Sequence, residues 1–84
     1  MYTLRSSDQV DDQIAHLPRE ALAAFAEVRA VLEVAPWSGD SINDADPNAP
    51  VRSWAFGPEG RGAIYYLIQE RDRLVDLLDV LWAA

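Results

Sequence analysis

The 84-residue sequence contains no cysteine and no lysine, and it has no long run of apolar residues. Without cysteine the chain forms neither a disulfide framework nor a thiolate zinc site, and we expect no metal site and no cofactor. No apolar run reaches membrane length and no cationic leader precedes an apolar segment. We therefore expect no membrane association and a cytoplasmic location.

Positive charge is also scarce, because seven arginines accompany 14 acidic residues and the formal net charge is -7. A protein that binds free nucleic acid draws most of its affinity from neutralised phosphates. The acidic balance therefore argues against unassisted binding to DNA or RNA. Any such contact would need the arginines gathered on one face.

The composition is typical of a folded domain, with half of the residues hydrophobic and a quarter charged. A chain of this length hides only about 60–65% of the surface that its unfolded form exposes. We therefore predict a single domain, residues 1–84, with one thin core and no deep substrate cavity.

A short strand and a helix are predicted at the start of the chain. Residues 2–5 alternate apolar and polar side chains, which suits an opening strand with its apolar residues facing inward. Ser6 and Gln9 have the spacing of a capping box, and apolar residues follow at helical spacing. A first helix is therefore predicted over about residues 7–17.

A second, longer helix and a long loop follow. Pro18 suits the first turn of a helix, and an apolar stripe then recurs to about Ala35, before Pro36 ends the helix. Residues 36–50 are dense in turn formers, and a loop of this length in so small a domain is typically functional or mobile. Its aspartates and asparagines lack the spacing of a calcium loop, so turn chemistry is the better interpretation.

The second half of the chain predicts a meander of antiparallel strands. One β-branched and aromatic run, Val51 to Phe56, ends at the turn formers of residues 57–60, and another reaches Ile68. Residues 74–82 are ambiguous, because their four leucines would also line one face of a helix. We favour a strand, because a third strand completes a sheet wide enough to be stable.

The central strand carries the candidate site. If Ile64 and Ile68 pack on the helices, alternation turns Arg61 and Tyr65 outward from the uncovered face, with Arg52 close by on the neighbouring strand. An arginine beside a tyrosine on an open sheet can hold a phosphate or a partner carboxylate. The alternative is an exposed Arg61 that pairs only with nearby Glu59.

The whole pattern resembles the RelE/ParE superfamily of bacterial toxins. The resemblance rests on the order of elements and on three stretches, namely Leu17-Pro18-Arg19-Glu20-Ala21, the Pro36-Trp37 helix exit and the strand from Gly60 to Ile68. It implies an α+β fold in the order β-α-α-β-β-β, with a two-helix hairpin on one face of a small antiparallel sheet. It also implies an antitoxin partner that wraps the domain, and a target that is DNA gyrase or ribosome-bound mRNA.

Three positions bear on the activity that the resemblance implies. Ala63 stands where the family has an arginine, and the preceding strand carries Trp54 and Phe56 where RelE-type nucleases usually have basic residues. RNA cleavage needs charge stabilisation at the phosphate and a group that moves the 2′-hydroxyl proton. The residues that could supply them are Arg52, Arg61 and Tyr65.

We therefore predict a toxin-like component of a toxin–antitoxin pair that acts by binding a target such as gyrase. One alternative is a ribosome-dependent mRNA endonuclease, and another is a non-toxic interaction module of the same fold. The binding residues would be Arg61, Tyr65 and Trp82. Leu77, Leu81 and Trp82 also form an apolar C-terminal segment, which predicts a homodimer or a partner peptide.

Overall fold

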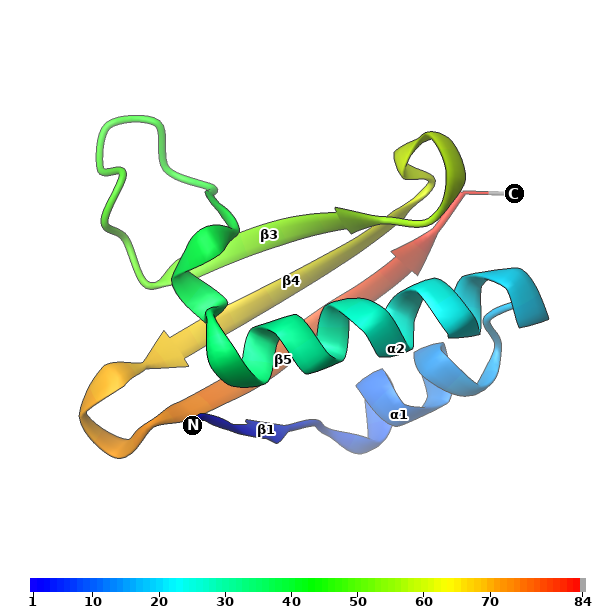
Figure 1. The fold of residues 1–84 in the computed structure, drawn as a ribbon, viewed down its shortest axis with the longest axis horizontal. Coiled ribbons are helices and arrows are strands. Elements are labelled where there is room, and N and C mark those ends of the chain that lie inside the picture. Colours follow the sequence, from blue (N-terminus) through cyan, green and yellow to red (C-terminus); the bar gives the residue numbers. More distant parts are fainter. Residues whose placement is uncertain (84) are drawn as a thin grey trace.

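Two helices cover one face of a five-stranded sheet in the computed structural model, which describes residues 1–83 (Figure 1). The elements in chain order are β1 (Thr3–Arg5), α1 (Asp8–Ala15), α2 (Arg19–Val34), β2 (Asp40–Ser41), β3 (Val51–Phe56), β4 (Gly62–Gln69) and β5 (Leu74–Trp82). The predicted α+β fold with its two-helix hairpin is confirmed. The short strand β2 was not predicted.

The sheet is mixed rather than purely antiparallel. Its order is β1-β5-β4-β3-β2, in which β2, β3, β4 and β5 pair antiparallel. The edge strand β1 runs parallel to β5. A hairpin forces an antiparallel partner, but almost the whole chain separates β1 from β5, so no turn sets the direction of β1.

The helices begin and end close to the predicted residues. The N-cap of α1 is Ser7, whose Oγ accepts a hydrogen bond from the backbone N–H of Val10 at 3.2 Å. The prediction of Ser6 as the cap is therefore wrong by one residue, and Ser6 instead donates to the Asp11 carboxylate. Within residues 1–83, neither helix is long and apolar enough to cross a membrane.

The core lies between α2 and the sheet. Alternate residues of β4 from Gly62 to Ile68 are buried, and Ile64 and Tyr66 are fully enclosed. Phe25 of α2 meets Phe56 of β3 edge to face, with ring centroids 5.9 Å apart. The predicted assignment of the two faces of β4 is thus confirmed.

The last segment is a strand, and it contains a β-bulge. Tyr65 pairs with Asp79 while Tyr66 pairs with Leu77, so Leu78 is an extra residue without a partner on β4. Leu77 consequently faces the core, whereas the Leu78 side chain is 45% exposed.

Candidate functional site

The open face is the side of the sheet that the helices leave uncovered. Strand register places Tyr65 near its centre, opposite Ser53 of β3 and Asp79 of β5. The Tyr65 side chain is half-buried. Most other residues that β3, β4 and β5 place on the open face are small or apolar: Val51, Ala55, Ala63, Leu67, Leu74, Leu78 and Leu81.

Arg52 does not lie on the open face, so the prediction that places it beside Tyr65 is wrong. It pairs with Tyr66 across β3 and β4, and Tyr66 points into the core. Residues directly opposite each other share a face of the sheet, so Arg52 lies on the helix side and is only 7% exposed.

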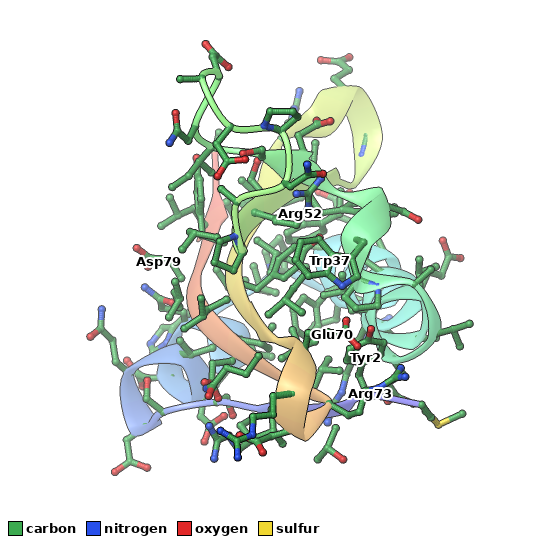
Figure 2. The ribbon with its side chains drawn as sticks, turned by 90° about the vertical axis from the view of Figure 1, so that its left-hand side faces the viewer. Tyr2, Trp37, Arg52, Glu70, Arg73 and Asp79 are labelled. Carbon is green, nitrogen blue, oxygen red and sulfur yellow. The ribbon has the colours of Figure 1, made fainter. Side chains whose placement is uncertain are left out.

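The buried guanidinium of Arg52 bonds to backbone carbonyls of the long loop. Its Nε and Nη2 donate to the Gly39 carbonyl at 3.1 and 2.6 Å, and its Nη1 donates to Pro47 and Ala49 at 3.1 Å each. The guanidinium also lies 5.3 Å from the centre of the Trp37 ring (Figure 2). Arg52 therefore organises the loop, and each of its three nitrogens already donates a hydrogen bond.

The loop itself is built from side chains that mimic backbone turns. Asn43 Oδ1 accepts from the Ala45 N–H, and Asp46 Oδ1 accepts from the Asn48 N–H, each at 3.0 Å. Ser41 Oγ donates to the Asp46 carbonyl at 2.8 Å. Turn chemistry is confirmed, and residues 1–83 contain no group of three or more metal-ligating side chains in this loop or elsewhere.

Arg61 lies in the turn between β3 and β4, one residue before the strand begins. Its Nη2 is 3.7 Å from Glu59 Oε2, and both side chains are largely exposed. This is the alternative pairing that the sequence left open. Tyr65 lies four positions after Arg61, which corresponds to about 13 Å along an extended strand. The two side chains are therefore too far apart to hold one small ligand together.

Trp82 and Leu77 belong to the inner side of the sheet. The Trp82 ring packs on the Phe56 ring, with centroids 6.0 Å apart, and a side chain at Gly57 would strike it. Leu77 is buried. Of the three residues predicted to form an apolar C-terminal surface, only Leu81 is exposed as expected, at 47%.

Asp79 was not predicted as part of the site, yet it lies beside Tyr65. Its Oδ1 accepts from Gln13 Nε2 at 2.7 Å, and the Gln13 Oε1 accepts from the Val80 N–H at 2.9 Å. Gln13 of α1 thus caps the edge of β5 where β1 has ended. Figure 2 shows Asp79 at this side of the molecule. No arginine pairs with Asp79 within residues 1–83, so its negative charge is uncompensated.

A second carboxylate on β5 is neutralised. Asp76 accepts two hydrogen bonds from Arg5, at 2.7 Å from Nε and 3.1 Å from Nη2, and a further one from Gln69. The Arg5 hydrogen bond lowers the pKa of Asp76, against the opposing effect of burial. This pair joins β1 to β5 at the edge of the open face.

A third carboxylate, that of Glu70, connects the N-terminal residue Tyr2 and the turn residue Arg73 to Trp37 at the start of the long loop. Glu70 Oε1 accepts from the Tyr2 hydroxyl at 2.5 Å and from Trp37 Nε1 at 2.7 Å, while Arg73 Nε lies 3.3 Å from Oε2 (Figure 2). The Tyr2 hydrogen bond, followed by that of Trp37, lowers the pKa of Glu70. The cluster lies away from the open face and has a structural role.

Comparison with known proteins shows the class of fold. No family model matches the sequence, and no curated protein does. Solved structures do match: a chain of the intact E. coli RelBE toxin–antitoxin complex superposes with a TM-score of 0.76 at 12% identity, over 100% of this chain and 99% of that chain. The isolated E. coli RelE toxin gives 0.69 at 16% identity, over 100% and 86%.

An archaeal structure also matches the fold of this chain. A chain of the RelE–RelB complex from Pyrococcus horikoshii OT3 gives a TM-score of 0.68 at 18% identity, over 96% of this chain and 93% of that chain. The chain therefore has a RelE-like toxin fold. Identities this low establish the fold alone, and function has to be argued from the residues of the open face.

Proposed function

We propose that this chain is the toxin-like component of a toxin–antitoxin pair, and that it acts by binding a cellular target such as DNA gyrase. One observation carries the proposal. Within residues 1–83 the open face of this RelE-like fold holds a half-buried tyrosine among apolar side chains, while the nearest arginines are buried, paired or outside it.

The positions of the arginines argue against RNA cleavage at the open face. Cleavage requires cations where negative charge develops on the phosphate. Arg52 is committed to loop carbonyls, and Arg61 pairs with Glu59 in the turn. Strand register places Asp79 of β5 opposite Tyr65, and its carboxylate repels a phosphate.

The same surface suits a protein partner. Protein interfaces are enriched in tyrosine and apolar side chains at their centre and depleted in charge there. The matched solved structures include RelE–RelB complexes, which supports an antitoxin as one partner of this chain. The target is a second partner, which the antitoxin would exclude.

Inducible expression in E. coli tests the proposed function. We expect growth arrest with intact mRNA, arrest lost in Tyr65→Asp and Leu81→Asp, and arrest kept in the matched turn variant Arg61→Ala. Arrest accompanied by cleaved mRNA would establish the endonuclease alternative. Unimpeded growth with a well-folded protein would leave the non-toxic interaction module.

A further inference from the structure

The β-bulge gives the open face an unusual pair of neighbours. In a regular strand, adjacent residues point to opposite faces. Because Leu78 is the inserted residue, Leu78 and Asp79 both escape the core, while Leu77 before them and Val80 after them are buried. Bulges often re-aim side chains next to functional sites. An exposed apolar side chain thus sits beside an uncompensated carboxylate.

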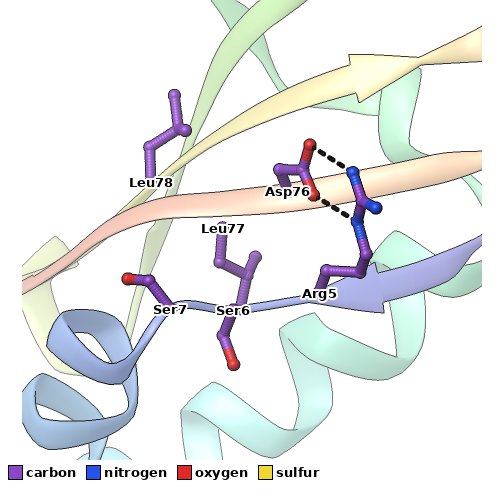
Figure 3. A pocket seen from close by; sticks show the side chains of 6 residues that line it. All are labelled: Arg5, Ser6, Ser7, Asp76, Leu77 and Leu78. Atoms are coloured by element: carbon purple, nitrogen blue, oxygen red, sulfur yellow. Dashed lines mark hydrogen bonds and ion pairs between the residues drawn. The ribbon is translucent and has the colours of Figure 1, made fainter.

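A hollow adjoins Leu78. It has a volume of about 410 Å³ and lies where β1 ends, between the Arg5–Asp76 ion pair and Leu78 (Figure 3). Ser6, Ser7 and Leu77 complete its lining. Since Arg5 and Asp76 neutralise each other, the hollow offers room for an apolar side chain next to a polar rim.

The charge of the molecule indicates which kind of ligand the open face favours. The net charge is -7. Among residues 1–83 the strands place one arginine on the open face, Arg5 of β1, and it is already paired with Asp76. A second copy would bring an equal negative charge to the same surface, and RNA would bring phosphates to Asp79. A cationic protein segment is attracted by the same field.

We propose that the open face binds a cationic amphipathic segment of the partner protein. Its apolar side chains pack on Leu78 and Leu81 and reach the hollow, and one arginine or lysine pairs with Asp79. The inference rests on the proposed function and deepens it, because it states the chemistry of the antitoxin segment. It follows from charge and exposure at named positions of this chain.

Two synthetic helical peptides provide the test. Both are about 16 residues long, which gives about four turns, and both carry the same leucine face. One bears arginines on its polar face and the other bears glutamates. Calorimetry measures affinity for the full chain, and amide chemical shifts of the isotope-labelled chain map the contact.

We expect the arginine peptide alone to bind, with shifts concentrated at Tyr65, Leu78 and Leu81. Asp79→Asn keeps the acceptor for Gln13 but removes the charge, and it should weaken binding about five-fold or more. The matched control Asp44→Asn makes the same charge change in the exposed loop and should alter affinity by less than about two-fold. Leu81→Ser should weaken binding without unfolding the chain.

Several results would overturn the inference. Equal weakening by Asp79→Asn and Asp44→Asn would mean that the peptide senses only net charge. Shifts centred on α2, preference for the glutamate peptide, or a dimer that buries Leu81 would each assign the face differently. Growth arrest plays no part in this readout. A chain that binds the peptide but causes no arrest therefore contradicts the proposed function alone.

Discussion

Arg52 was predicted to contribute to the functional site, but in the structure it stabilises the long loop. Within residues 1–83 this buried cation has no carboxylate partner, and each of its three nitrogens donates to a backbone carbonyl of Gly39, Pro47 or Ala49. Removing it leaves the buried carbonyls of Gly39 and Ala49 without these donors. We expect Arg52→Ala to lower the free energy of unfolding by about 2–4 kcal/mol, measured by urea denaturation with tryptophan fluorescence.

Two variants control this experiment. Arg61→Ala removes an arginine from an exposed turn and should change stability by less than about 0.5 kcal/mol. Arg52→Lys keeps the charge but lacks the planar fork, so it should recover only part of the loss. If Arg52→Ala is as stable as Arg61→Ala, the loop does not depend on the guanidinium.

Tyr66 predicts an alkaline response. Burial raises its pKa from 10.0 to about 12, and its hydroxyl donates to the Pro36 carbonyl at 2.7 Å. The unfolded chain therefore loses this proton first, so stability falls as pH rises from 10 to about 12, by up to about 1.4 kcal/mol per pH unit. The chain has no lysine or cysteine that titrates in the same window.

The Tyr66→Phe variant should show a shallower decline over that window. It also loses one buried hydrogen bond, so its stability at pH 7 should be lower by about 1 kcal/mol. Tyr65→Phe removes the same atom from a half-buried position on the open face and serves as the matched control. Parallel stability curves for Tyr66→Phe and the parent would contradict the assignment.

At the scale of elements, Gln13 connects α1 to the edge of β5. It donates to Asp79 and accepts from the Val80 N–H, so both ends of its amide are used. Gln13→Glu cannot donate and places a second negative charge beside Asp79. We expect it to destabilise the chain more than Gln13→Ala, which should cost about 1 kcal/mol in thermal or urea unfolding. The reverse order would show that the amide is not bonded as described.

The joint between β1 and β5 predicts an acid response. Arg5 lowers the pKa of Asp76 below its ordinary value of 3.8, so the pair stabilises the fold above that pH and loses its effect as pH falls through the lower folded value. Half of the Arg5 side chain is exposed. We therefore expect Arg5→Gln to lower the stability at pH 7 only slightly, and by much less than Arg52→Ala does. In acid titrations followed by circular dichroism, the curves of variant and parent should converge below pH 3.8.

At the scale of the molecule, the net charge of -7 governs encounters. Free RNA should not bind at about 0.1 M salt, because the net negative charge of the chain repels the phosphates. A mobility-shift assay with single-stranded RNA checks this expectation, and Asp79→Arg provides a variant with one cation added to the open face. Tight, salt-sensitive binding by the parent chain would contradict the protein-binding role.

The sequence by itself determined much of the architecture. Pro18 and Pro36 delimit the second helix, because proline cannot continue a helix from within. Alternation in β4 assigned Ile64 and Tyr66 to the core and Tyr65 to the open face, because side chains in a strand have a period of two. These are local rules, and each acts within a few residues.

The tertiary structure alone decided the register. A residue in β3 can be placed on either face until its partner in β4 is known, and the pairing of Arg52 with Tyr66 put the arginine inside. The bulge at Leu78 likewise changed the spacing of the buried residues of β5 from two, between Val75 and Leu77, to three, between Leu77 and Val80. Both depend on contacts between distant segments, and local propensity carries no information about those.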